Sequence, residues 1–368
     1  MRIVVVGATG NVGTAVLRRL AAVRAGGDGA GGTGAGHGGA HAATVPDAAR
    51  GEVELVGVAR RLPDAHAEPY ASAVWHSVDV GATDAVDRLA AVFRGADAVI
   101  HLAWALQPTH DIPTQYRTNV TGTANVLAAV ARVGVPQVVI ASSVGTYRGV
   151  DVDGKHTPVD ETWPTDGIPT ATYSIHKAEN EAALDAFEAE HPSVVVTRLR
   201  PGLIFQRDAA AEIRGLFLGH LVPMSIVRWV RWLVLPLPYP FVFQAVHADD
   251  VADAYWRAVD RRAGGAFNIA ASPVLNPPRL ARAFGMLGAV RIPLRLLRGI
   301  VTLTWRLRLQ PTDAGWIDIA AGVPIMRTDR ARTVLGWEPR HTSEDALRAL
   351  VAGFADGANV PASGPLRG

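Results

Sequence analysis

Cysteine is absent from this chain of 368 residues. Its absence excludes a disulfide framework, a thiolate nucleophile and a cysteine-ligated metal site, and it agrees with a reducing compartment. No apolar run reaches the ~18 uninterrupted residues of a membrane-spanning helix, because proline or arginine interrupts each candidate. The opening run Met-Arg-Ile-Val-Val-Val-Gly is too short for a signal peptide and lacks its cleavage pattern. We therefore expect a cytoplasmic protein, and we assign no metal site.

Lysine is almost as scarce, because Lys155 and Lys177 are the only two, whereas arginine occurs 34 times. The formal net charge is only +2 and the basic residues are spread along the chain, so the composition does not favour nucleic-acid binding. Wholesale disorder is excluded by the 49% of hydrophobic and 19% of charged residues. An ammonium and a guanidinium are not interchangeable beside a phenol. Lys177 follows Tyr173 by four residues, which makes this pair the first candidate site.

Strands and helices are expected to alternate through the first two hundred residues. The strand candidates are 2–6, 53–59, 74–78, 97–101, 137–142 and 194–199, and helical stretches lie near 15–23, 83–93, 112–133 and 170–190. This alternation predicts an α/β fold with a doubly wound, mostly parallel Rossmann-type sheet that is covered on both faces. Such sheets bind ligands at the carboxyl ends of their strands.

Changes in composition divide the chain further. We assign residues 1–200 to a dinucleotide-binding domain, in which 25–51 are almost wholly Gly, Ala, Thr, His and Asp and are expected to form a flexible surface insertion. After Arg200-Pro-Gly, long apolar segments begin. We assign 201–245 and 271–368 to a smaller C-terminal α/β region that binds or covers substrate, whereas 246–270 is expected to return to the first domain.

A glycine-rich turn, GATGNVG, follows the first strand and precedes a helix. Glycine at positions spaced three apart lets the backbone turn tightly and approach a pyrophosphate, whose charge is met by the helix N-terminus. We therefore predict that a dinucleotide binds along this turn. The residues assigned to it are Gly7, Thr9, Gly10, Asn11, Val12 and Gly13.

The second strand ends in Ala59-Arg60-Arg61 and not in an acidic residue. A carboxylate there would hold the ribose 2′-hydroxyl of NAD, whereas a guanidinium can bind the 2′-phosphate of NADP in a charge-assisted fork. Arg60 and Arg61 therefore favour NADP over NAD. The alternative is that both are solvated loop arginines.

Tyr173 and Lys177 are expected on one face of a helix, since they lie four residues apart. An unperturbed phenol has a pKa of about 10, and a nearby ammonium is expected to lower it, so that Tyr173 could act as a general acid or base. Ser143, which closes a strand about thirty residues earlier, could hydrogen-bond the reacting oxygen. Its alternative role is that of a capping serine.

Taken together, these motifs resemble the extended branch of the short-chain dehydrogenase/reductase superfamily, which includes NAD-dependent epimerases and dehydratases. The resemblance runs from Met1 to about Ala270. It implies an NAD(P)-dependent oxidoreductase in which Ser143 polarises the substrate oxygen, Tyr173 exchanges its proton and Lys177 holds the nicotinamide ribose. It also implies that Asp79 and Val80 lie beside the adenine of the cofactor and that Leu102 and Ala103 lie beneath its nicotinamide-side ribose. Asn119 and Thr123 would border the site, and Arg200–Gly202 and His247–Asp250 match later sequence signatures of the family.

Departures from the family pattern bear on the substrate. Phe243 occupies the position at which nucleotide-sugar epimerases usually carry an arginine for the diphosphate, and Val144-Gly145 replace the Asp-Glu pair of the dehydratases. Residues 216–243 are mostly apolar, as suits a hydrophobic ligand, a core or a dimer contact. We therefore expect a reductase or hydroxysteroid-dehydrogenase-like enzyme for an apolar ketone or alcohol. The alternatives are a nucleotide-sugar epimerase and a non-catalytic regulator that senses dinucleotides.

Two expectations concern partners. Residues 291–308 interleave arginine with Leu, Ile and Trp, a pattern typical of a basic helix that lies on a membrane surface, although ordinary packing would also explain it. The family resemblance implies a homodimer through the helices near 112–133 and 170–190.

Overall fold

A computed structural model describes residues 1–26, 53–106, 109–210, 233–238, 240–310, 312–358 and 360. The expected insertion at 25–51, from residue 27 onward, and residues 216–232 of the apolar segment lie outside the described residues. None of the helices in the described ranges is long and apolar enough to cross a membrane.

A seven-stranded sheet forms the centre of the molecule, and every adjacent pair in it is parallel. In spatial order its strands are β10 (Gly265–Ile269), β6 (Val195–Pro201), β5 (Gln137–Ala141), β4 (Ala98–His101), β1 (Arg2–Val6), β2 (Glu54–Ala59) and β3 (Val74–Ser77). The predicted α/β fold class is confirmed. Successive strands are added on one side of β1 up to β3 and on its other side from β4 onward. The carboxyl ends of β1 and β4 therefore border the crevice at which such sheets bind ligands.

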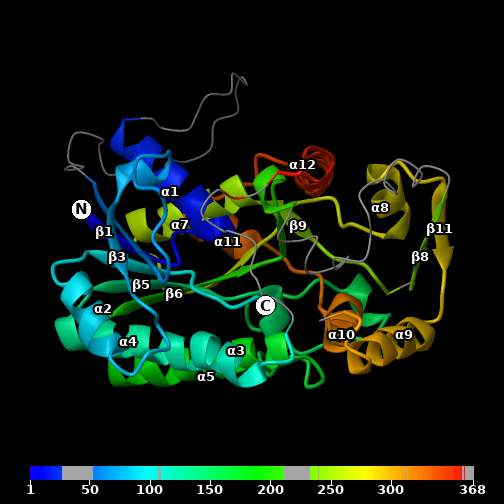
Figure 1. Cartoon of the computed structure of the whole chain (residues 1–368), viewed down its shortest axis with the longest axis horizontal. Helices are drawn as coiled ribbons and strands as arrows, with labels where there is room; N and C mark the ends of the chain where they lie inside the picture. The colour runs from blue at the N-terminus through cyan, green and yellow to red at the C-terminus, as the bar shows by residue number, and fades with distance from the viewer. Residues whose placement is uncertain are drawn as a thin grey trace.

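Helices cover both faces of the sheet (Figure 1). One face carries α1 (Asn11–Arg24), α7 (Ala248–Asp260) and α11 (Asp329–Leu335), and the other carries α2 (Ala85–Phe93), α4 (Gly122–Val133) and α5 (Thr172–Glu190). The predicted helix at 112–133 is three pieces, because a π-helical turn, η3 (Arg117–Thr121), separates α3 (Ile112–Tyr116) from α4.

The side-chain period of two explains the apolar run of β1. In β1, Ile3 and Val5 join the core under α1 and α7, whereas Val4 and Val6 join the core under α2 and α4. A strand that is buried on both faces therefore shows an uninterrupted apolar run, as β1 does.

A smaller α/β region follows β6, as predicted. It contains two short parallel ladders, β7 (Leu203–Phe205) with β9 (Ala245–His247) and β8 (Val234–Leu237) with β11 (Gly288–Arg291). The helices of this region among the described residues are α8 (Pro277–Ala283), α9 (Leu294–Arg306), α10 (Gly315–Gly322) and α12 (Ser343–Asp356). The described ranges also contain the short 3₁₀ turns η2 (Tyr70–Ser72), η4 (Val144–Thr146), η5 (Gly154–His156) and η6 (Arg207–Ala209). In Figure 1, β8, β11 and α9 lie at the end of the molecule opposite α2.

Candidate active site

The glycine turn between β1 and α1 packs too closely for a side chain at two of its three glycines. A Cβ on Gly7, which has a φ of +85°, would lie 2.5 Å from the Ala103 nitrogen, and one on Gly13 would lie 2.3 Å from the Gly7 oxygen. These two glycines are therefore required by the packing. A Cβ on Gly10 would meet only the Gly7 oxygen, at 3.5 Å, and Gly10 caps α1 with no side-chain hydrogen bond. The open backbone at Gly10 fits a pyrophosphate group.

The other residues assigned to this turn have varied surroundings. Val12 is partly buried and packs against the core beneath α1. Gln206, next to β7, donates from Nε2 to the Asn11 carbonyl oxygen at 3.1 Å and also contacts the Asn11 side chain. Thr9 lies within the turn itself. The glycine turn is thus tied to the smaller C-terminal region through Gln206.

The end of β2 carries the two arginines assigned to cofactor choice. Arg60 and Arg61 are exposed, and among the described residues no carboxylate forms an ion pair with either guanidinium. Asp79 accepts from the Gly81 nitrogen at 3.0 Å and from Arg117 at 3.4 Å. The side chain of Asp79 therefore also stabilises its own loop. Val80 is buried, and its carbonyl accepts from Asn125 Nδ2 at 2.8 Å.

At the end of β4, Leu102 and Ala103 lie beside the glycine turn, since the Leu102 nitrogen donates to the Val6 carbonyl at 2.7 Å. The preceding His101 is buried, and its Nε2 lies 3.1 Å from Thr123 Oγ1. Burial, assisted by the charge of Lys177, lowers the pKa of His101 to about 3. His101 is consequently neutral and belongs to the support of the site.

Ser143 and Tyr173 come together at the end of β5. Ser143 Oγ accepts from the Gly145 nitrogen at 3.0 Å, so Ser143 caps η4. The ring of Tyr173 packs over Gly145, where a Cβ would lie 2.8 Å from Tyr173 Cε1. Burial raises the pKa of Tyr173 to about 12, although a hydrogen bond with Ser143 acts in the opposite direction. The expected lowering of this pKa by Lys177 is therefore wrong for this structure.

The surroundings of Lys177 explain why it does not lower the pKa of Tyr173. Its Nζ donates to the Ala141 carbonyl at 2.7 Å, lies 3.5 Å from the centre of a Trp104 ring, and is 5.9 Å from the centre of the Tyr173 ring. Burial lowers the pKa of Lys177 to about 7, and Glu181 only partly compensates. The amine is thus partly neutral at pH 7 and faces Ala141 and Trp104. The indole of Trp104 therefore packs directly on this amine.

Two tryptophans flank Tyr173, and the sequence did not single them out. Trp104 meets the tyrosine edge-on with ring centres 5.6 Å apart, and Trp316 of α10 lies at 5.2 Å. Trp104 directly follows Leu102 and Ala103 at the end of β4, and this position in the sequence could have indicated its place in the site. Trp316 carries no local signal, because only the tertiary fold brings α10 to α5. A small pocket beside Tyr173 is lined by Ala105, Leu106, Thr109, Gln115, Asn119, Thr172, Asp313 and Trp316.

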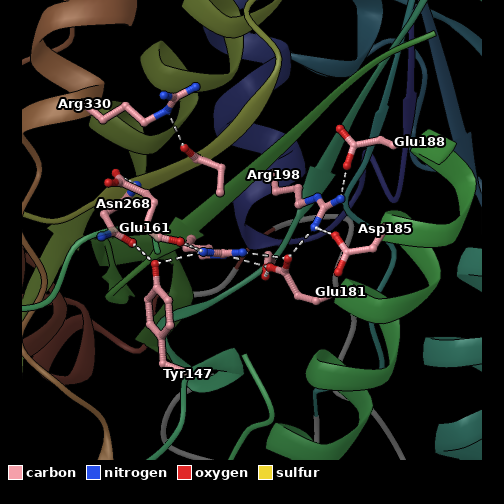
Figure 2. Close-up of polar contacts among 11 residues, drawn as sticks. Tyr147, Glu161, Glu181, Asp185, Glu188, Arg198, Asn268 and Arg330 are labelled. Atoms are coloured by element: carbon pink, nitrogen blue, oxygen red, sulfur yellow. Dashed lines mark hydrogen bonds and ion pairs between the residues drawn. The ribbon is translucent and has the colours of Figure 1, made fainter. Parts of the chain in front are cut away.

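A buried carboxylate, Glu181, ties the site together and was also not singled out. Glu181 accepts from Ser142 Oγ at 2.5 Å, from Arg200 at 2.8 and 2.9 Å, and from Arg198 at 3.1 Å (Figure 2). Burial alone would raise the pKa of Glu181, but these hydrogen bonds and charges outweigh it and hold the pKa below its ordinary value. The spacing of eight from Tyr173 along one helix face was its signal. Glu181 fixes α5 against β5 and β6.

The same network reaches the last strand of the sheet. Arg200 also donates to the Tyr147 hydroxyl at 3.1 Å and to the Glu161 carbonyl at 2.9 Å, and Tyr147 donates to Asn268 Oδ1 at 2.6 Å. In Figure 2 these groups form a continuous polar chain between α5 and β10. Arg200, which the family pattern marked as a signature, is therefore an internal support in this structure.

Phe243 and His247, which lie in the later part of the family pattern, both have structural roles. Phe243 pairs with Leu275 in an isolated bridge and packs against the core of the smaller region. His247 caps α7 by accepting from the Asp249 nitrogen at 3.2 Å, and its ring stacks on His341 with ring centres 4.2 Å apart. Phe243 thus supplies apolar packing at the position where nucleotide-sugar epimerases usually carry an arginine for the diphosphate.

Lys177 makes the stability of the protein depend on pH. Because burial lowers its pKa from 10.5 to about 7, the unfolded chain holds a proton that the folded chain releases between these values. The free energy of unfolding should therefore rise by on the order of 3 kcal/mol from pH 7 to 10. Lys155, whose pKa burial lowers to about 8, acts in the same direction. Urea unfolding of the parent, Lys177→Met and Lys155→Met at several pH values measures each share. An unchanged pH slope in Lys177→Met would contradict the assignment.

Comparisons with known proteins place this geometry in context. A family model, the NAD dependent epimerase/dehydratase family, matches residues 33–270. A UDP-glucose 4-epimerase of Azospirillum brasilense is 24% identical over 94% of this chain and 89% of its own length. A 3beta-hydroxysteroid-dehydrogenase/decarboxylase of Arabidopsis thaliana is 35% identical over 116 residues, so the matched part spans 31% of this chain and only 25% of the plant enzyme.

Solved structures share the fold. The UDP-glucose 4-epimerase of Thermus thermophilus, in complex with NAD, superposes with a TM-score of 0.64 at 18% identity, covering 96% of this chain and 99% of that one. At this identity the likeness shows the fold alone.

Proposed function

Since the chain belongs to the NAD-dependent epimerase/dehydratase family, we propose that its site exchanges a hydride at the carbon of a secondary alcohol or ketone, with Tyr173 as the acid–base group. The observation that carries the proposal is that Tyr173 and Ser143 lie together against Gly145 at the carboxyl end of β5, beside the small pocket. A nicotinamide cofactor, when bound, supplies or accepts the hydride. Family membership supports an enzyme over a dinucleotide-sensing regulator.

At neutral pH the protonated form of Tyr173 is the form that reduction of a carbonyl uses. With a pKa raised to about 12, its hydroxyl is protonated at neutral pH and can donate to a carbonyl oxygen as the alcohol forms. In the opposite direction Tyr173 must accept the alcohol proton, which requires its pKa to fall. Ser143 would hydrogen-bond the same oxygen. Lys177 would hold the nicotinamide-side ribose, as the family resemblance implies.

The cofactor is held, in this proposal, by the open backbone at Gly10 and by the exposed arginines after β2. We expect NADP to bind more tightly than NAD, because Arg60 and Arg61 lack carboxylate partners among the described residues. The double change Arg60→Glu, Arg61→Glu should weaken NADPH binding by about a hundredfold and leave NADH within severalfold. Titration with nicotinamide fluorescence measures both. Arg94→Glu, an exposed change after α2, is the matched control, and equal NADPH affinity in parent and double variant would refute the preference.

Two substrate classes remain for the same chemistry. The aromatic walls of Trp104 and Trp316 and the apolar Phe243 support a hydrophobic ketone or alcohol. The UDP-glucose 4-epimerase match covers nearly the whole chain, whereas the hydroxysteroid-dehydrogenase match covers only about a third of it. The comparisons therefore support a nucleotide-sugar epimerase better than an enzyme for an apolar ketone or alcohol. An epimerase would oxidise and re-reduce one carbon and keep its NAD bound.

The fate of the cofactor separates these classes. The denatured supernatant of the purified protein is first assayed for NAD or NADP, and the protein is then titrated with NADPH and NADH. Exchangeable NADPH, followed by its oxidation with apolar ketones, is the expected result for the reductase. NAD that co-purifies, together with isomerisation of a UDP-sugar without net cofactor turnover, establishes the epimerase. Neither activity in a folded, cofactor-binding protein would refute the proposed hydride exchange.

A further inference from the structure

Helix α9 (Leu294–Arg306) leaves an apolar stripe uncovered. None of its thirteen residues is buried. Leu296, Ile300, Leu303 and the following Leu307 are spaced by four, three and four residues, so they lie on one face, and each is between 51% and 60% exposed. Four large aliphatic side chains in such a row are unusual on the surface of a soluble domain and mark an interaction site.

The opposite face of α9 is fixed to the protein. Arg298 forms an ion pair with Asp318 of α10, with its Nε 2.9 Å from Asp318 Oδ1. Trp305 stacks on His110 with ring centres 4.9 Å apart, and its carbonyl oxygen lies 3.2 Å from His110 Nε2. Because these contacts hold the inner face, the exposed apolar stripe faces away from the protein. Helix α9 itself lies at one end of the molecule (Figure 1).

The charged side chains of α9 and of its flanking residues all have one sign. Residues 291–308 contain five arginines and no lysine, aspartate or glutamate, although the whole chain carries only +2. Arg295 and Arg306, three turns apart along one edge of the stripe, are exposed and form no ion pair with a described residue, and the same holds for Arg308 just beyond the helix. An apolar stripe with a basic edge matches an anionic lipid surface, in which aliphatic groups enter the acyl boundary and arginines meet the headgroups.

Further apolar side chains are exposed at the same end of the molecule. Val234 of β8 and Val290 of β11 are 49% and 46% exposed, and Leu287, which precedes β11, is 67% exposed. A symmetric contact between two copies of this chain would instead bring the basic edges of both helices together with no acidic partner from α9. The charge pattern therefore favours a lipid surface over a second copy.

We propose that α9 docks this protein on the surface of an anionic bilayer, with Leu296, Ile300 and Leu303 inserted at the headgroup boundary and Arg295 and Arg306 against the phosphates. The helix lies on the membrane and does not cross it. The docking is independent of which substrate class the active site accepts.

Vesicle flotation of the full chain tests this proposal. The protein should float with vesicles of phosphatidylcholine containing one part in three of phosphatidylglycerol, and should stay unbound with phosphatidylcholine alone. Ile300→Glu with Leu303→Glu should abolish flotation, whereas Val152→Glu, an equally polar change at another exposed position, should not. Arg295→Gln with Arg306→Gln should weaken binding about fivefold per arginine, and added salt should weaken it further. Arg94→Gln is the control for charge.

Circular dichroism and the thermal midpoint confirm that each variant is folded, which the exposure of the altered side chains leads us to expect. Equal binding to neutral and anionic vesicles, or unchanged flotation of the Ile300→Glu, Leu303→Glu protein, would overturn the proposal. Absence of flotation together with a dimer in light scattering that the same double change dissociates would overturn it in favour of a second copy.

Discussion

Replacing Tyr173 with phenylalanine is expected to lower kcat by about a hundredfold to ten-thousandfold, which is the range of general acid–base catalysis. The change removes one oxygen atom and leaves the ring between Trp104 and Trp316, so packing is preserved. The lost hydroxyl is the group that contacts Ser143. Cofactor affinity, measured by nicotinamide fluorescence, should change less than severalfold, and kcat is measured on the alcohol, ketone or UDP-sugar that the cofactor experiment identifies.

Tyr116 supplies the matched control. It is 43% exposed on α3 and contacts His176 edge-on, away from Ser143. Tyr116→Phe removes the same atom from a neighbouring tyrosine and should leave kcat near the parent value. A Tyr173→Phe protein that turns over at the parent rate would refute the acid–base assignment. A loss of kcat in both variants would show that the tyrosine hydroxyls act through the structure of α3 and α5.

The largest effect on stability is expected at Glu181. Its side chain is 1% exposed, and Arg200 and Arg198 are 4% and 7% exposed. Glu181→Gln removes the negative charge and leaves the Arg200 guanidinium with neutral acceptors alone: the amide oxygen that remains at position 181, the Tyr147 hydroxyl and the Glu161 carbonyl. Breaking a buried ion pair in this way costs about 3–5 kcal/mol of unfolding free energy. Guanidinium-induced unfolding measures the loss.

Asp185 is the control for this change. It also pairs with Arg198, with 2.6 Å between Oδ1 and Nη1, but its side chain is 68% exposed. Asp185→Asn should therefore cost less than about 1 kcal/mol. If the two substitutions were equally costly, the burial of Glu181 would not be the source of its effect. If both were neutral, the network in Figure 2 would contribute specificity of packing and not stability.

The sheet was predictable from local pattern. Strands buried on both faces appear as apolar runs, and β1, β2 and β4 begin and end within one residue of their predicted limits. The π-helical turn between α3 and α4 could not be predicted, because apolar residues have similar spacing in an α-helix and in a π-helical turn. At this turn Asn119 makes two hydrogen bonds with the Ala105 backbone. Such a long-range contact leaves no trace in the helical period.

The candidate site was predictable only in its parts. Spacing placed Tyr173 and Lys177 on one helix face, and the strand end supplied Ser143. Burial raises the pKa of Tyr173, and the amine of Lys177 donates to the Ala141 carbonyl beneath Trp104; neither follows from spacing. Trp316 and the arginines around Glu181 lie on other elements. Their arrival at the site is a property of tertiary packing.

The burial of both lysines gives this chain an unusual chemical surface. Lys155 and Lys177 are only 6% and 4% exposed, so neither side-chain amine faces solvent. Acylating labels and amine-directed cross-linkers will find no lysine on the closed molecule. With a pKa near 7, however, Lys177 is a good nucleophile as soon as Trp104 moves aside. Its rate of acylation, read by mass spectrometry, therefore measures how often solvent reaches the amine beneath Trp104.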